Sequence, residues 1–328
     1  MARRRPAVVH GILAVNKPLG VTSRAVVNRA MYLFGERRCG HAGTLDPDAS
    51  GVLVLAFGRA TKVIRWLTDG HKTYLADVRF GTATHTDDAQ GDTLRSAALP
   101  SPWTMASLDL AAQRDVGGLI AQVPPAVSAL KFEGVRDYER VHRGETIARP
   151  ARPVRLDAVR TLTIAASEAR FEVDCGPGFY VRAWARDLGA HLGSAAHLYG
   201  LKRLRSSGFS LEGCVDLDEV ERVGLAERRA LLVPLETALG RTLPVLAVDA
   251  AATVALVDGK RPAAPPGAEA SDAALILGPD GQGICVASVA QGEAGLILRV
   301  VRGLREDGAP AFRALVAAAH AVEPGFSP

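Results

Sequence analysis

The chain has 328 residues, a net charge of +4 and a pI near 9.0. This length suggests two domains, or one large domain with an appendage, and an apolar content of 48% allows a sizeable core. Mild basicity is compatible with a polyanionic partner without demanding one. The four cysteines are far apart and form no Cys-x-x-Cys pair. The pattern therefore indicates free thiols rather than a zinc site or a disulfide framework.

The N-terminal stretch carries the basic triplet Arg3-Arg4-Arg5 and then a short apolar run that ends at Asn16-Lys17-Pro18. No cleavage-site pattern follows it, and no stretch is long enough to span a membrane. We therefore expect a soluble, cytoplasmic protein.

Hydrophobic periodicity predicts the elements of the first 120 residues. Thr22 or Ser23 can cap a helix, while residues 71–81 alternate with Tyr74 at the start of the apolar face. The predicted elements in order are a strand at 8–15, a helix at 22–34, a buried strand at 52–57, a short helix at 59–67, the alternating strand at 71–81, a polar loop at 82–93 and a helix at 108–120.

The loop at residues 38–51 presents one carboxylate, that of Asp46, from a stiff turn. Three glycines loosen its backbone and Pro47 restricts it, and the unbroken apolar run of 52–57 follows at once. Locally, Asp46 could be a plain turn former. It could also be a phosphoryl-transfer nucleophile, with Asp48 helping to hold magnesium. His41 could be a base, a stacking group or a core histidine.

Pro124-Pro125 opens a segment of different character, in which residues 128–155 interleave basic and aromatic side chains and look like an inserted arm. If residues 135–143 are helical, Arg136, Arg140 and Arg143 share one face that could track phosphates. A solvated helical face is the alternative, because acidic residues dilute the charge.

The rest of the chain predicts a strand at 170–175, a glycine turn and a helix in which Arg182 occupies the first turn, off the buried stripe. A second basic cluster follows at 198–205. Beyond residue 245 we predict a small β-rich domain. Its elements are a helix at 250–257 capped by Asp249, a Pro/Ala/Gly-rich loop at 261–273, a hairpin at 274–289 and a strand at 294–301.

Several of these stretches together resemble one family. The segment from Gly40 to Leu53, with its Gly-His-Ala-Gly-Thr-Leu-Asp-Pro core, closely resembles the signature of the TruB family of tRNA pseudouridine synthases. Further matches follow in the family's order across residues 12–204. They are Asn16-Lys17-Pro18-Leu19-Gly20, Lys72-Thr73-Tyr74, the Pro124-Pro125 and Gly134 segments of the RNA-binding insertion, Gly178 to Gly189 with Arg182, and Leu201-Lys202-Arg203-Leu204. Asp48 departs from the family, which often has an apolar residue there.

This resemblance implies an α+β, mixed-sheet catalytic domain at 8–244 with an RNA-binding insertion at about 124–155, and a PUA-like RNA-binding β domain at 245–320. It implies isomerisation of uridine to pseudouridine at position 55 in the TΨC loop of tRNA, by base flipping and without metal or cofactor. It also implies a cytoplasmic monomer that contacts no membrane.

The resemblance also assigns roles to single residues. Asp46 is the implied nucleophile, attacking C1′ or C6; Tyr74 stacks on the base and assists at C5; Arg182 pairs with Asp46. The glycines of the Asp46 loop are implied to make room for a nucleotide, and His41 to hold the RNA loop open where the base leaves the stack. The implied substrate-binding residues are His41, Tyr180, Leu201, Lys131, Arg136, Arg140, Arg143, Lys202 and Arg203.

Two functions of other classes stay open beside this one. An RNA-binding protein or tRNA-folding chaperone would need no chemistry, although that activity could accompany the enzyme. An aspartate-dependent phosphotransferase would require magnesium.

Overall fold

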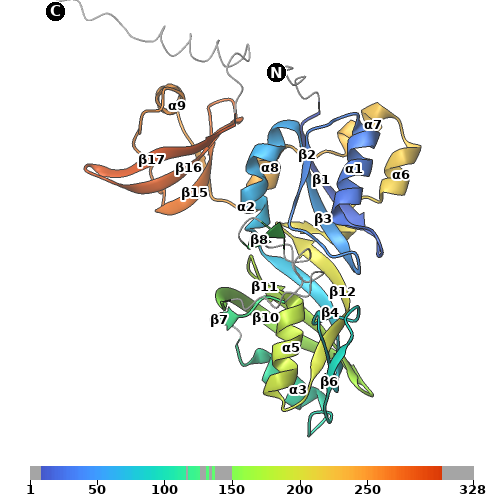
Figure 1. The fold of residues 1–328 in the computed structure, drawn as a ribbon. Helices are drawn as coiled ribbons and strands as arrows, with labels where there is room; N and C mark the ends of the chain where they lie inside the picture. The colour runs from blue at the N-terminus through green and yellow to red at the C-terminus, as the bar shows by residue number, and fades with distance from the viewer. Residues whose placement is uncertain (1–8, 116, 126–130, 133–134, 137–149, 305–328) are drawn as a thin grey trace, which may run out of the picture.

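A computed structural model of the chain describes residues 9–115, 117–125, 131–132, 135–136 and 150–304. In this part of the chain a mixed sheet of nine strands is the central element, ordered β1-β3-β12-β4-β11-β10-β7, with β2 added to β3 and β13 to β12 (Figure 1). The β3–β12 pairing is parallel and the others are antiparallel. The strands are β1 (Gly11–Lys17), β2 (Cys39–Ala42), β3 (Ala49–Phe57), β4 (Lys72–Phe80), β7 (Leu119–Gln122), β10 (Arg152–Ala165), β11 (Glu168–Cys175), β12 (Ala196–Ser206) and β13 (Phe209–Ser210).

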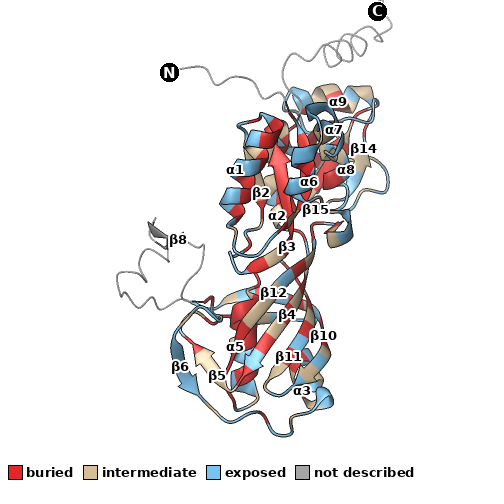
Figure 2. Ribbon diagram, turned by 90° about the vertical axis from the view of Figure 1, so that its right-hand side faces the viewer, coloured by how far each residue is buried: buried red, intermediate tan, exposed pale blue. Residues whose placement is uncertain are grey.

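The β1–β3 end of this sheet is covered on both faces. On one face, α1 (Ser23–Phe34) and α6 (Leu217–Arg222) pack on alternate residues such as Leu53 and Leu55. On the other, α2 (Ile64–Thr68) and α8 (Leu235–Leu239) pack on Val52 and Val54. Burial on both faces explains why the sequence of β3 is apolar without a break (Figure 2). The strand predicted at 52–57 and the helix at 22–34, with Thr22 as its N-cap, are confirmed.

The other end of the sheet is covered on one face by α3 (Met105–Gln113) and α5 (Val181–His191). Phe171 meets Trp184 of α5 edge-on, with ring centroids 5.2 Å apart. The alternation predicted for residues 71–81 is confirmed, because Tyr74 and every second residue after it are buried in β4.

A second sheet of four strands, β14-β15-β16-β17, follows residue 244. The predicted hairpin, the third strand and the Asp249-capped helix are all present. This sheet is not isolated: Leu275, Val286 and Leu304 join the cluster that covers β1 and β3. Its elements are β14 (Val245–Ala247), α9 (Ala250–Val257), β15 (Ser271–Leu277), β16 (Gly283–Gly292) and β17 (Gly295–Gly303).

Three predicted elements were wrong. The helix expected at 108–120 ends at Gln113, and its last part is strand β7, which pairs with β10. The loop at 82–93 is framed by two short strands, β5 (Thr82–Thr84) and β6 (Thr93–Ser96). The helix considered from residue 135 does not begin there, because β9 (Val135–Arg136) pairs with β8 (Lys131–Phe132).

Short elements complete the described chain: the 3-10 helices η1 (Gly58–Val63) and η2 (Leu211–Gly213), and helix α7 (Leu225–Ala230). Together η1 and α2 replace the single helix predicted at 59–67. All four cysteines are described and all are free, as predicted. Among the described helices, none has the length and apolar character needed to cross a membrane.

Candidate active site

Asp46 lies in the connection between β2 and β3, and the backbone around it is tied down from several sides. The Ser23 hydroxyl donates to the Leu45 carbonyl at 2.8 Å and accepts from the Leu45 N–H at 2.9 Å, and both bonds are buried. The Pro47 carbonyl accepts from Gly20 N–H at 2.8 Å and from the Lys17 ammonium at 3.2 Å. The backbone at Asp46 is therefore fixed, while the Asp46 side chain stays half-exposed, at 50%.

Arg203 holds the same loop from below. Its side chain is 1% exposed. Its guanidinium donates to the carbonyls of Val52 at 2.7 Å, Gly43 at 3.0 Å and Thr44 at 3.5 Å. These bonds give Arg203 a structural role in the Asp46 loop, and its predicted contact with the substrate stays a prediction. Its neighbour Lys202 is exposed, as an RNA contact requires.

The loop glycines make room for the protein rather than for a nucleotide. A Cβ on Gly51, whose φ is +101°, would lie 2.2 Å from the carbonyl oxygen of Arg203. A Cβ on Gly40 would lie 2.7 Å from a methyl group of Ile64. The prediction that these glycines accommodate the substrate is therefore wrong for both positions, which serve close packing of β3 on β12 and of β2 on α2.

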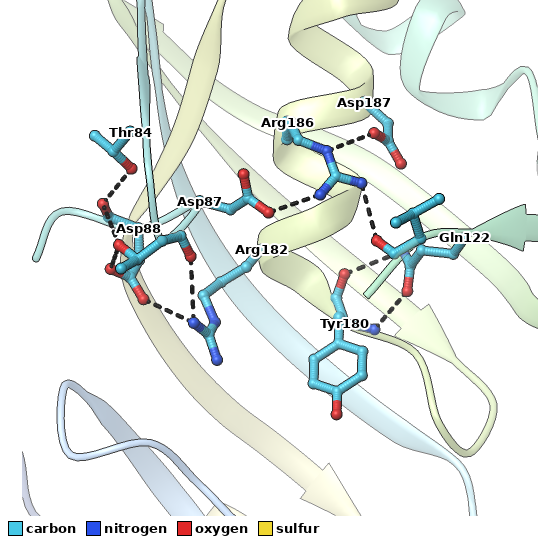
Figure 3. A network of polar contacts seen from close by, with 10 residues as sticks. Thr84, Asp87, Asp88, Gln122, Tyr180, Arg182, Arg186 and Asp187 are labelled. Atoms are coloured by element: carbon cyan, nitrogen blue, oxygen red, sulfur yellow. Dashed lines mark hydrogen bonds and ion pairs between the residues drawn. The ribbon is translucent and has the colours of Figure 1, made fainter. Parts of the chain in front are cut away.

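Arg182 joins Asp46 to a second aspartate. It is the second residue of α5 and its side chain is 8% exposed. The guanidinium lies 3.0 Å from Asp46 Oδ2 and 3.0 Å from Asp88 Oδ2, and it donates to the Thr86 carbonyl at 3.2 Å (Figure 3 shows the contacts with the Asp88 turn). A buried guanidinium needs such partners, and bonds on two sides fix its direction. The pairing of Asp46 with Arg182 that the resemblance implied is thus present.

A cleft of about 290 Å³ opens beside this ion pair. It brings together residues from five separate segments of the sequence, because β3, β12 and β4 are neighbours in the sheet and α5 begins beside Asp46. In the register of the sheet, Leu201 lies opposite Ala49 of β3, and Arg203 lies opposite Tyr74. The predicted residues that line the cleft are Asp46, Tyr74, Arg182, Tyr180, Leu201 and Arg203.

Two titratable side chains in the cleft have shifted pKa values. Tyr74 is 7% exposed, and burial raises its pKa, so the phenol stays neutral and a phenolate base is disfavoured. Burial, together with the nearby Arg203 guanidinium, lowers the pKa of Lys72 to about 8. The Lys72 ammonium donates to the carbonyls of Thr68 and Gly70, each at 2.6 Å. At neutral pH the cleft therefore contains the neutral phenol of Tyr74 and the ammonium of Lys72, whose pKa of about 8 is close to that pH.

His41 lies on β2, opposite Leu55, two residues before the first residue that lines the cleft. Its ring is half-buried, its Nδ1 is buried without a hydrogen-bond partner, and burial lowers its pKa. The role of His41 in base extraction stays a prediction.

The predicted contacts in the insertion are described only in part. Lys131 and Arg136 are opposite each other in the β8–β9 hairpin, while Arg140 and Arg143 lie outside the described residues. The structure also adds site residues that the sequence did not reveal, namely Lys17, Ser23, Lys72 and Asp88. Asp88 was hidden in a polar segment without periodicity. The signal that could have revealed Asp88 is the pair Arg182 and Arg186, which lie one helical turn apart on the same face of a helix and so call for acidic partners nearby.

Comparison with known proteins identifies the family. The model described as "TruB family pseudouridylate synthase (N terminal domain)" matches residues 31–181, and the model of the "tRNA pseudouridylate synthase B C-terminal domain" matches residues 182–240. The chain belongs to the TruB family. It is therefore a pseudouridylate synthase, an isomerase. The two TruB matches end at residue 240, so the PUA-like character of residues 245–320 and the predicted domain boundaries stay predictions.

Individual TruB relatives agree with this assignment. A tRNA pseudouridine synthase B from Mycobacteroides abscessus is 41% identical over 81% of this chain and 88% of its own length. One from Paracoccus denitrificans is 39% identical over 77% and 84%. Among solved structures, a Cbf5-Nop10-Gar1 complex has a chain similar with a TM-score of 0.68 at 22% identity, covering 90% of this chain and 85% of that one. That likeness supports the mixed-sheet fold.

Proposed function

We propose that this TruB enzyme isomerises uridine to pseudouridine at position 55, in the TΨC loop of tRNA. The substrate class is supported by the names of relatives at 38–49% identity, which are tRNA pseudouridine synthases B. The observation that carries the proposal is the Asp46 carboxylate, held 3.0 Å from a buried Arg182 at the edge of a cleft that Tyr74 also lines.

In the proposed reaction the flipped-out uridine enters this cleft, with Tyr74 against one side of the base and Leu201 on the other. Asp46 is the nucleophile, at C1′ of the ribose or C6 of the ring. The N1–C1′ bond breaks and a C5–C1′ bond forms, and the bond that Asp46 made breaks again before the product leaves. The C5 proton passes to water and N1 takes a proton from water, so the product is an isomer of the substrate. In this proposal no step calls for a redox cofactor or a metal.

Arg182 orients the carboxylate and balances its charge, because Arg182 is fixed on its other side by Asp88. Exposed Lys202 and the insertion residues Lys131, Arg136, Arg140 and Arg143 contact tRNA phosphates in this proposal. The enzyme acts as a cytoplasmic monomer, with residues 245–320 as a further RNA-binding unit.

The test is to incubate the purified protein with an unmodified tRNA transcript, without metal beyond that needed to fold the RNA, and to map pseudouridine at single-nucleotide resolution. We expect one product, at position 55. Modification only at other uridines would refute the site, and no modification in any tRNA would refute the substrate class.

A further inference from the structure

The two ends of the insertion are joined to the helix that carries Arg182. The insertion leaves the sheet at the end of β7 and returns at the start of β10, where Gln122 and Arg152 are direct partners in the β7–β10 pairing. Both side chains turn to the segment just before α5. Arg152 donates to the Gly178 carbonyl, and its guanidinium carbon lies 4.9 Å from the centre of the Tyr180 ring.

Gln122 binds Tyr180 through both ends of its side-chain amide. It is 1% exposed. Its amide oxygen accepts from the Tyr180 N–H at 2.8 Å, and its amide nitrogen donates to the Tyr180 carbonyl at 3.1 Å (Figure 3). Tyr180 is the N-cap residue of α5, and its carbonyl also accepts the first helical bond, from Trp184. A single side chain therefore fixes the point where α5 begins, two residues before Arg182.

Arg186 repeats this link one turn further along α5. It donates to the Val123 carbonyl at 3.0 Å, and it lies 2.7 Å from Asp87 Oδ2. Asp87 is the neighbour of Asp88, which holds Arg182. Thus the two arginines of α5 are interlocked with two consecutive aspartates, and the outer arginine is also tied to the first residue of the insertion beyond β7 (Figure 3).

We propose that Gln122 and Arg186 are positioning residues: they couple the foot of the insertion to the first two turns of α5 and so align Arg182 with Asp46. This inference rests on the proposed function. Neither residue touches the reacting atoms in it. Because a misplacement of about 1 Å can cost about 100-fold in rate, their loss should act on the chemical step rather than on tRNA affinity.

The test compares Gln122→Leu, which removes both amide bonds at similar volume, with Gln113→Leu. Gln113 is exposed on α3, where it donates to Asp109. We would measure the single-turnover rate of uridine conversion at saturating enzyme, the tRNA Kd and the thermal midpoint. The expected result for Gln122→Leu is a rate about 10- to 100-fold lower with a Kd within about 3-fold of wild type, and no change for Gln113→Leu.

A rate within about 3-fold of wild type, or a Kd that rises by as much as the rate falls, would overturn the proposal. If Gln122→Leu does not fold, Arg186→Lys decides: a lysine can pair with Asp87 but cannot also reach Val123, so the same loss of rate at constant Kd is expected. Its control is Arg160→Lys, an exposed arginine paired with Glu172.

Hydrogen exchange separates this proposal from the proposed function. Amides at the start of α5 should exchange faster in Gln122→Leu than in Gln113→Leu. If the wild-type protein makes no pseudouridine, the proposed function fails, and the exchange result still shows whether Gln122 fixes the helix. If the wild type is active and the exchange and rate of Gln122→Leu are both unchanged, only the positioning role fails.

Discussion

Replacing Arg203 by methionine tests whether this arginine is a support of the Asp46 loop or an RNA contact. Methionine has a similar length and keeps the packing, but it donates no hydrogen bond. The two shorter bonds, to Val52 and Gly43, would be lost, and an unsatisfied buried carbonyl costs about 1–3 kcal/mol. The bond to Thr44, at 3.5 Å, adds little. The Val52 bond is buried, whereas the Gly43 carbonyl is part-buried and water can replace its lost partner, so the expected loss in free energy of unfolding is about 1–3 kcal/mol.

Lys202→Met is the matched control, since Lys202 is the exposed neighbour of Arg203 on β12. Urea unfolding would measure stability, and the salt dependence of tRNA binding would count phosphate contacts. Lys202→Met should leave the free energy of unfolding unchanged and lower the salt slope of tRNA binding by about 1. Arg203→Met should lower the free energy of unfolding and leave the salt slope unchanged. An Arg203→Met protein with unchanged stability and a lower salt slope would refute the structural role.

Three further outcomes are expected. Asp88→Asn removes one of the two carboxylates that fix Arg182, so kcat should fall by about 10-fold or more with little change in tRNA Kd. Steady-state kinetics would measure the change, and an unchanged kcat would count against this role of Asp88. Gly51→Ala should lower the free energy of unfolding by at least about 3 kcal/mol, because its Cβ meets the backbone of β12. Gly20 also has a positive φ but lies in open space, so Gly20→Ala should cost only about 1–2 kcal/mol. Equal losses in the two variants would contradict the packing argument. Since the pKa of Lys72 is lowered to about 8 in the folded protein, the unfolded chain binds more protons between about pH 8 and pH 10. The free energy of unfolding should therefore rise with pH across that range in the wild type but not in Lys72→Met, and the same rise in both would assign it to another group.

The sequence predicted the elements whose signals are local. Helix α1 was read from its Thr22 cap and its periodic apolar face, and β3 from an unbroken apolar run that only burial on both faces explains. The family motifs also identified three residues, Asp46, Tyr74 and Arg182, that the fold brings to one cleft. The motifs identified these residues because each motif lies on a segment that borders the same cleft.

The sequence did not predict the features that depend on tertiary contacts. The charge of Arg203 gave no sign of burial, because its carbonyl partners are backbone atoms more than 150 residues away. In the sequence, nothing distinguishes Asp88 from the other polar residues of its loop, and only the contact with Arg182 of α5 shows its role. The glycines of the Asp46 loop were assigned to the substrate because the neighbouring strand β12, which requires them, is distant in sequence.

The most direct test of the central claim is the turnover of Asp46→Asn on an unmodified tRNA transcript. Asparagine has nearly the same shape, so the loop, the cleft and tRNA binding should be retained while the nucleophilic carboxylate is lost. The account predicts a tRNA Kd close to that of the wild type and no pseudouridine at any uridine. Measurable pseudouridine formation by purified Asp46→Asn would contradict it.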